Sequence, residues 1–240
     1  MSKIDVKELF LPKKYIKNKA ISYDSPKDCN YWDSSRISTA INFQYSVYQW
    51  ADEIIKTEKF VHIADVGCGM AYKLNKLYQW NNNLMPSGFD QPNAIALCKE
   101  HYSYGEWIGV NLDDSPKAPD KKFELVISSD VIEHLENPDN LLDYIKDIVS
   151  PYGFILISTP ERDLLRGRGC MQSPNKAHVQ EWNQDEFSQF LKAKGFRIIE
   201  KRILQAIRPS FSFSYIRRQL KRILKFRTMR YSQTYLLKKI

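Results

Sequence analysis

An apolar segment that runs into two closely spaced glycines, at residues 61–71, constrains the fold of this chain more than any other feature. The sequence V-H-I-A-D-V-G-C-G-M-A places Asp65 near its end, Gly67 and Gly69 directly after it, and a helical pattern from about Tyr72. This order is typical of a buried parallel strand that turns sharply into a helix. Glycine lets the backbone turn and lie close to a ligand, because it carries no Cβ. We therefore expect a ligand crevice in front of the helix, whose first N–H groups point into it.

Two further strand-like segments end in polar side chains that suit a bound nucleoside. Residues 84–90 end in Asp90, whose carboxylate can accept hydrogen bonds from both hydroxyls of a ribose. Residues 107–111 end in Asn111, whose side-chain oxygen can bond an adenine amino group, with Leu112 against the ring. A glycine turn alone does not separate NAD, FAD and S-adenosylmethionine as ligands, since all three are bound by such turns.

A fourth strand-like segment, residues 123–129, is followed by D-V-I-E-H-L-E-N-P at 130–138. The order of these segments resembles the class I S-adenosylmethionine-dependent methyltransferases over residues 60–206. The resemblance is to the branch with D-V-G-C-G in the first loop and D-V-I-E-H-L-x-x-P after the fourth strand. A dinucleotide dehydrogenase usually has a third glycine at the helix entry and no need of an acid–histidine segment. Two positions depart from the family pattern: Ala71 stands where a third glycine is frequent, and Asn111 where aspartate is frequent.

The resemblance implies an α/β fold, with a Rossmann-like, doubly wound, seven-stranded and mostly parallel sheet whose last strand is antiparallel. Helices are expected at 37–56, 72–82, 91–102, 138–149 and 184–194, and the last three strands at 153–159, 195–200 and 228–237. An N-terminal arm and capping helix (1–56), irregular over residues 1–33, precede the methyltransferase domain (57–240). A basic amphipathic insertion (208–227) lies before the last strand.

The resemblance also implies that the cofactor is S-adenosylmethionine and indicates where it binds. Asp65 would help to hold the methionine moiety, Asp90 the ribose, and Ser129 would present its backbone carbonyl to the methionine amino group. Asn111 would recognise adenine less strongly than aspartate does. The full set of expected cofactor-binding residues is Asp65, Gly67, Cys68, Gly69, Asp90, Gln91, Asn111, Leu112, Ser129 and Asp130.

His134 and His178 are the two candidates for a catalytic base, because a histidine with a pKa near neutrality can accept a proton from an acceptor. Each has a structural alternative, in which it only braces the loop that carries it. His178 has Glu181 three residues later as a carboxylate that could orient it.

Other polar residues have weaker functional interpretations. Lys73 is expected to be a solvated helix residue, and a polar loop is expected at 166–175. The arginines in and before that loop either grip an acceptor phosphate or are solvated; they are Arg162, Arg166 and Arg168. The cysteines have no paired spacing, so we expect reduced thiols and no metal site; they are Cys29, Cys68, Cys98 and Cys170.

The positive charge of the chain is concentrated in its last segment. The net charge is +8, but 10 of the 36 Lys and Arg residues and none of the 28 Asp and Glu residues fall in 208–240, so residues 1–207 carry a net charge of −2. This distribution disfavours a nucleic-acid surface that covers the whole domain. The insertion at 208–227 either packs on the domain through its apolar face or contacts an anionic partner, such as a membrane surface or a phosphate-bearing acceptor.

These observations predict a methyltransferase that O-methylates a sugar or another small-molecule or glycan hydroxyl, by analogy with enzymes of polysaccharide synthesis. The alternatives are N-methylation of a small amine and, lower in rank, a non-catalytic protein that binds the cofactor or a membrane. RNA methylation is disfavoured. The sequence shows neither a signal peptide nor a membrane span, so we expect a cytoplasmic protein. If the segment 208–227 contacts a membrane, we expect the protein to be peripheral to the inner membrane face.

Overall fold

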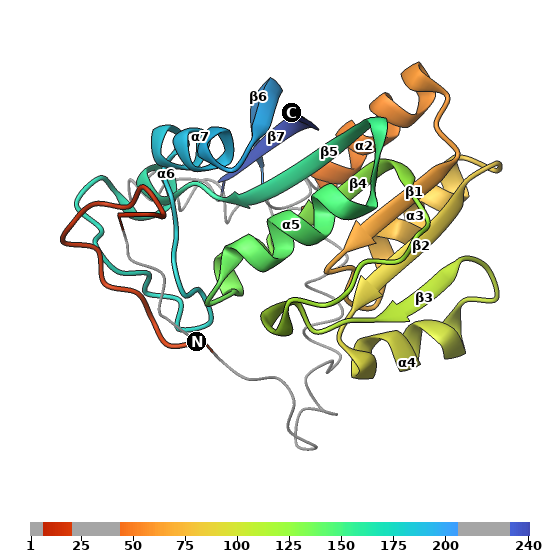
Figure 1. Ribbon diagram of the computed structural model, residues 1–240, viewed down its shortest axis with the longest axis horizontal. Helices are drawn as coiled ribbons and strands as arrows, with labels where there is room; N and C mark the ends of the chain where they lie inside the picture. Colours follow the sequence, from red (N-terminus) through yellow and green to blue (C-terminus); the bar gives the residue numbers. More distant parts are fainter. Residues whose placement is uncertain (1–6, 21–43, 206–230) are drawn as a thin grey trace, which may run out of the picture.

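The computed structural model describes residues 7–20, 44–205 and 231–240, in which a seven-stranded sheet carries helices on both faces (Figure 1). The strands are β1 (His62–Val66), β2 (Met85–Asp90), β3 (Glu106–Gly109), β4 (Phe123–Ser129), β5 (Val149–Pro160), β6 (Phe196–Gln205) and β7 (Tyr231–Lys239). The helices are α2 (Tyr45–Glu58), α3 (Tyr72–Trp80), α4 (Pro92–His101), α5 (Pro138–Ile148), α6 (Arg162–Arg166) and α7 (Gln184–Ala193), with 3-10 turns η2 (Leu112–Asp114) and η3 (Ile132–His134).

The strands follow the order β3-β2-β1-β4-β5-β7-β6. β1 pairs in parallel with β2 and β4, and β4 pairs in parallel with β5. β7 runs antiparallel between β5 and β6. The strand order reverses between β1 and β4, and α/β proteins bind ligands at the carboxyl ends of the strands beside such a switch point. The expected doubly wound, mostly parallel sheet with an antiparallel last strand is confirmed.

Alternate residues of β1 face the two layers of helices. Ala64 and Val66 pack in a buried cluster with apolar side chains of α5 and α7. Ile63 packs in a second cluster with side chains of α2, α3 and α4. Because both faces of β1 are covered, all its residues from Ile63 to Val66 are buried, Asp65 included. Within the described ranges, no helix combines the length and the apolar character needed to cross a membrane.

Most expected helices and strands are present, with ends that differ by a few residues. β5 and β6 are longer than expected: β5 begins at Val149, and β6 extends to Gln205 through its pairing with β7. No helix was expected over 162–166, but α6 forms there because the Glu161 side chain caps it, accepting a hydrogen bond from Leu164 N (2.5 Å). The expected helix residues 37–43 and the basic insertion 208–227 lie outside the described residues.

The described part of the N-terminal arm, residues 7–20, contains neither helix nor strand, but it is anchored. Leu9 and Tyr15 are buried, with 0% and 4% of their surfaces exposed. The Leu9 carbonyl accepts a hydrogen bond from Trp182 Nε1 (2.9 Å), and the Tyr15 hydroxyl accepts one from Glu181 N (2.8 Å). The arm therefore braces the segment that follows α6.

Candidate functional site

In the turn after β1, both the backbone conformation and a neighbouring side chain require glycine. Gly67 has a φ of +84°, and a Cβ at this position would lie 2.2 Å from Val131 Cγ2. The close approach that requires glycine here is therefore to Val131, which follows β4. Ala71, at the position where the family pattern often has glycine, also has a left-handed φ of +53° and directly precedes α3. Among the residues that the structure describes, no side chain caps the N-terminus of α3, so its first N–H groups are suited to a ligand.

Asp90 ends β2 and holds the glycine turn. Its carboxylate accepts hydrogen bonds from Gly69 N (2.6 Å) and Gln91 N (2.7 Å). Burial raises the pKa of Asp90, although these two hydrogen bonds oppose the rise. A carboxylate has about four lone-pair positions, so two remain for donors of a ligand.

Asp65 is buried at the end of β1 and has an unsatisfied oxygen. Its Oδ2 accepts a hydrogen bond from the Tyr48 hydroxyl (2.8 Å), while Oδ1 has no hydrogen-bond partner within the described part of the chain. Burial raises the pKa of Asp65 to about 7. Lys73 is half-buried: its ammonium lies 5.5 Å from the Tyr48 ring centroid, and burial lowers the pKa of Lys73, so this lysine is only partly solvated. The orphaned Oδ1 is suited to a cationic or N–H group of a ligand.

The remaining cofactor-side residues lie around this turn, but several are engaged within the protein. Cys68 is buried beneath the turn, with its thiol directed at the Gly69 carbonyl (3.5 Å). The Asn111 side chain caps η2: its Oδ1 accepts from the backbone N of residue 113 (3.2 Å), and its Nδ2 donates to Asp114 Oδ2 (2.6 Å). Leu112 is buried beside it. Asn111 therefore has one lone pair of Oδ1 left for an adenine amino group.

The end of β4 carries a strained and strongly held acid. Asp130 has a φ of +54°, which is unfavourable for a residue with a Cβ. Its carboxylate accepts hydrogen bonds from Ser158 Oγ (2.8 Å), Gln44 Nε2 (2.9 Å) and Ser232 Oγ (3.3 Å). Ser158 also lies 2.8 Å from the hydroxyl of Ser129, the last residue of β4. Strain of this kind persists where the surroundings fix it, often at functional sites.

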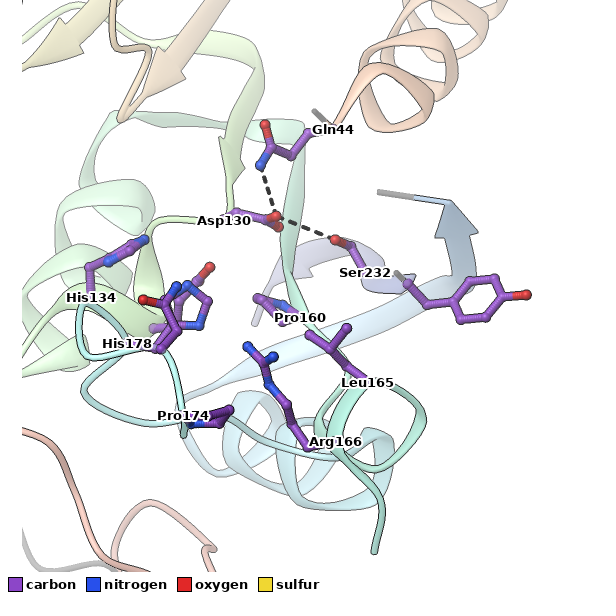
Figure 2. Close-up of a pocket in the computed structure, with 12 residues that line it drawn as sticks. Gln44, Asp130, His134, Pro160, Leu165, Arg166, Pro174, His178 and Ser232 are labelled. Atoms are coloured by element: carbon purple, nitrogen blue, oxygen red, sulfur yellow. Dashed lines mark hydrogen bonds between the residues drawn. The ribbon is translucent and has the colours of Figure 1, made fainter. Parts of the chain in front are cut away.

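Asp130 lines a cavity of about 380 Å³ at the carboxyl edge of the sheet, which we call the edge cavity (Figure 2). Its wall comes from the segment after β4, the end of β5, α6, the loop after α6, and β7. The polar side chains that line it include Asp130, Glu133, His134, Arg166, His178 and Ser232.

His134 and His178 meet in this cavity. Their ring centroids are 4.9 Å apart and the rings are nearly perpendicular. His134 Nδ1 lies 2.8 Å from the Ala177 carbonyl oxygen, and His178 Nδ1 lies 2.6 Å from Glu181 Oε1. A carbonyl or an ionised carboxylate oxygen only accepts hydrogen bonds, so Nδ1 carries a proton in both rings, and in a neutral imidazole of this tautomer Nε2 has the lone pair. Burial and the neighbouring His178 lower the pKa of His134 to about 4, so His134 stays neutral near pH 7.

Glu181 is fully buried and held in its ionised form. Burial opposes ionisation, but hydrogen bonds from His178 and Arg166 outweigh it and lower the pKa of Glu181 to about 2. Arg166 contacts both carboxylate oxygens, at 3.2 Å through Nε and 3.1 Å through Nη2, and Ser173 donates to Oε1 (2.8 Å). Arg166 thus lines the edge cavity while it is paired with Glu181.

The other two arginines take no part in this cavity. Arg162 is 2% exposed and forms a bidentate ion pair with Glu186, both N···O distances being 2.7 Å. The interpretation of Arg162 as a phosphate-gripping residue was therefore wrong, since it anchors α6 to α7. Arg168 is exposed beyond α6 and does not line the cavity.

Several site residues were not found from the sequence. Tyr48 reaches Asp65 from α2, and Ser158 and Ser232 reach Asp130 from β5 and β7. None of these residues belongs to a recognisable motif. Glu133 does lie inside the acid–histidine motif, and its position next to His134 was the one signal that could have drawn attention to it.

Comparisons with known proteins agree with this geometry. A family profile described as a methyltransferase domain matches residues 45–201. The mitochondrial ubiquinone biosynthesis O-methyltransferase of Dictyostelium discoideum is 27% identical over 44% of this chain and 37% of its own length. A probable S-adenosylmethionine-dependent methyltransferase of Mycobacterium tuberculosis is 26% identical over 56% of this chain and 48% of its own length. This chain thus spans less than half the length of either relative.

Solved structures share the fold. The plantazolicin methyltransferase BpumL in complex with SAH has a TM-score of 0.60 at 17% identity, over 98% of this chain and 96% of that chain. The [4+2]-cyclase SpnF has a TM-score of 0.57 at 16% identity, over 80% of this chain and 82% of that one. The family profile covers more than half of the chain. The chain therefore belongs to the methyltransferase domain family, with the class I fold and S-adenosylmethionine as its cofactor.

Proposed function

We propose that this protein transfers a methyl group from S-adenosylmethionine to a hydroxyl group of a small-molecule acceptor bound in the edge cavity. The observation that carries the proposal is the position of this cavity. It extends from Asp130, which directly follows the strand beside the glycine turn, to the His134–His178 pair. A cofactor at the turn and an acceptor at the histidines would therefore lie next to each other.

The residues around the turn fit the cofactor. The orphaned Oδ1 of Asp65 can accept a hydrogen bond from the amino group of the methionine moiety, directly or through water. The free lone pairs of Asp90 can accept hydrogen bonds from the ribose hydroxyls. Asn111 and Leu112 would contact the adenine, and the Ser129 carbonyl the amino group. When bound, S-adenosylmethionine supplies a methyl group on a sulfonium, so the protein does not need to activate a leaving group.

The protein must orient the acceptor, exclude water and accept a proton. Orientation alone contributes about 7–11 kcal/mol to barrier reduction in well-aligned systems. The better proton acceptor of the histidine pair is His178. Its Nδ1–H donates to the Glu181 carboxylate, which stabilises the imidazolium that forms when Nε2 takes a proton. The lowered pKa of His134 makes it the weaker base and leaves it to position the acceptor.

For the acceptor class we propose a sugar or other small-molecule hydroxyl. Support comes from the polar lining of the edge cavity, where histidine, arginine and asparagine side chains can bond several hydroxyls. One curated relative is named a ubiquinone biosynthesis O-methyltransferase and another a malonyl-[acyl-carrier protein] O-methyltransferase. N-methylation of a small amine is the second candidate, because a neutral imidazole can also accept a proton from an ammonium group. The proposed anionic contact of the segment 208–227 concerns residues outside the described ranges.

The test is methyl transfer from isotopically labelled S-adenosylmethionine to a panel of sugars, phenols, carboxylic acids and amines. Mass spectrometry of the products separates ethers from esters and methylamines. Methyl ethers as the main product are expected. Methylamines alone would select the second candidate, and retention of the cofactor without any labelled product would favour a non-catalytic protein.

A further inference from the structure

Three side chains with metal-binding atoms converge on the wall of the edge cavity. Glu133, His134 and His178 each offer one ligand atom, and the three atoms lie within 4.8 Å of one another. Atoms bonded to one ion at about 2.0–2.2 Å lie at most roughly 4.4 Å apart. Only a small inward shift of these side chains is therefore needed for all three to reach one cation.

Both histidines already have the outer partners that metal-bound histidines have. His134 Nδ1–H donates to the Ala177 carbonyl (2.8 Å), and His178 Nδ1–H donates to Glu181 Oε1 (2.6 Å). Histidines that bind a metal through Nε2 commonly donate Nδ1–H to a carbonyl or carboxylate, which fixes the ring and keeps the lone pair on Nε2. The two rings, which line one cavity, therefore have the Nδ1 partners that metal-bound histidines have.

Glu133 adds an independent observation. Its side chain is 0% exposed, and its Oε2 accepts a hydrogen bond from Thr159 Oγ1 (3.0 Å). Its Oε1 is buried and has no hydrogen-bond partner among the described residues, although Glu133 lines the edge cavity. A buried carboxylate oxygen without a partner is costly, and a cation is one group that would satisfy it.

We propose that Glu133, His134 and His178 bind a divalent transition-metal ion, through one carboxylate oxygen and two Nε2 atoms, with open positions toward the edge cavity. Two imidazoles and one carboxylate favour ions such as Zn²⁺, Mn²⁺, Co²⁺ and Fe²⁺ over Ca²⁺ and Mg²⁺, which prefer oxygen ligands alone. Asp130 lines the same cavity, but hydrogen bonds from three side chains already occupy its carboxylate. The sequence-based expectation of no metal site rested on the spacing of the cysteines, whereas His178 lies far along the chain from the other two proposed ligands.

The role of this ion in methyl transfer rests on the proposed function, whereas its binding does not. An acceptor hydroxyl at an open position of the ion would lose its proton more easily. A nitrogen that ligates the ion cannot also accept that proton, so the ion and direct proton acceptance by His178 are alternative ways to activate the hydroxyl. In both, the new oxygen–carbon bond forms as the sulfur–carbon bond breaks, and the proton leaves to His178 or to solvent.

The wild-type chain, without an affinity tag and stripped with EDTA, is titrated with Co²⁺ alone. A single bound equivalent with visible d–d absorption is expected. In NMR spectra the ring protons of His134 and His178 should be shifted or broadened, while those of the exposed His101 on α4 should not. No saturable binding, or an equal effect on His101, would overturn the proposal.

Substitutions then test the ligands one by one. Glu133→Gln, His134→Ala and His178→Ala should each weaken Co²⁺ binding by about 100-fold or more, and Glu181→Gln, which removes only an outer partner, by about 10-fold. His101→Gln is the matched control and should leave the affinity unchanged. Thermal melts show which variants are folded, and the wild-type spectra test the site without any substitution. Unchanged affinity in the three folded ligand variants would refute the site.

Two further measurements separate this proposal from the proposed function. If the EDTA-treated chain binds S-adenosylmethionine and methylates an acceptor, and Co²⁺ and Mn²⁺ do not bind, only the proposed metal site is refuted. If the cation binds but the cofactor does not, only the proposed function is refuted. If the cation binds and turnover is complete without it, the role of the ion in activation is overturned.

Discussion

The two sides of the site are held together in different ways. On the cofactor side, the turn at 65–71 is held by strand ends next to it, since Gly69 N donates to Asp90 at the end of β2. On the acceptor side, the wall at 161–183 is held by the N-terminal arm. Tyr15 bonds Glu181 across 166 residues of sequence, and Leu9 bonds Trp182 across 173.

This difference shows that the cofactor side is specified by segments close together in the sequence, and the acceptor side by contacts between distant segments. Substitutions on the cofactor side should change affinity for S-adenosylmethionine. Substitutions on the acceptor side should change turnover or stability and leave that affinity intact. The following predictions test this separation.

The largest effect is expected on turnover, from the acceptor side. His178→Ala should slow turnover by about 10²–10⁴-fold, the range that a positioned base contributes, and Glu181→Gln should slow it less. Calorimetry should show unchanged affinity for S-adenosylmethionine in both variants. Arg168→Ala, an exposed position in the same segment, is the control. A loss of cofactor affinity in both variants would contradict the prediction that acceptor-side substitutions leave this affinity unchanged.

The next largest effect is expected on cofactor affinity, from Asp90→Ala. The change removes a carboxylate that holds Gly69 N and is expected to bond the ribose, and hydrogen bonds to a charged group contribute about 1.5–3 kcal/mol each. We expect about 100-fold weaker binding by calorimetry, with Asp120→Ala at an exposed position as the control. Binding that is as tight as in the wild type would refute the ribose assignment.

A smaller effect, on stability, is expected from Tyr15→Phe. The change leaves the buried Glu181 N–H without its acceptor and should lower the free energy of unfolding by about 1–3 kcal/mol. Denaturant titration measures it, with Tyr152→Phe, at a position 87% exposed, as the control. An equal loss in both variants would show that the arm does not brace the acceptor wall.

The smallest predicted effect concerns pH. Burial raises the pKa of Asp65 from its ordinary value of 3.8 to about 7, so the carboxyl is protonated in the free protein below that pH. Its contribution to folding stability is fully present below about pH 4 and is lost as pH rises through 7.

A cationic methionine moiety binds the ionised form of Asp65, so affinity for S-adenosylmethionine should fall about 10-fold between pH 8 and pH 6. Calorimetry across this range measures it. Asp65→Asn should remove the part of the pH dependence that comes from this carboxyl. A slope that the substitution leaves unchanged would assign the titration to another group.

The fold was predictable from the sequence because its signals are local. The apolar run before Gly67, the acid at position 90 and the period of the helices each lie within a few turns of chain. Through the resemblance they predicted a doubly wound, mostly parallel sheet with an antiparallel last strand. The ends of β5 and β6 were missed because strand pairing, rather than local preference, sets them. Val149 at the start of β5 pairs with Phe123 of β4, and β6 pairs with β7 as far as Gln205.

The site was less predictable, for the same reason. The motif located Asp65 and His134, but not Tyr48 and Ser232, whose partners depend on how helices and strands pack. The distance between the histidines, and the burial of Arg162 against α7, also depend on tertiary contacts. A lone arginine in a polar segment carries no local sign of whether it faces solvent or an ion pair.

The anchoring of residues 7–20 also has a consequence for synthesis on the ribosome. The arm emerges early, but its partner Glu181 follows 166 residues after Tyr15. At about 5–20 residues per second, the nascent arm waits roughly 8–33 s before this contact can form. Until then Leu9, Leu11 and Tyr15, which are buried in the folded protein, lack the segment that the arm packs against. The acceptor side should therefore be completed after the strands that hold the cofactor have already been made.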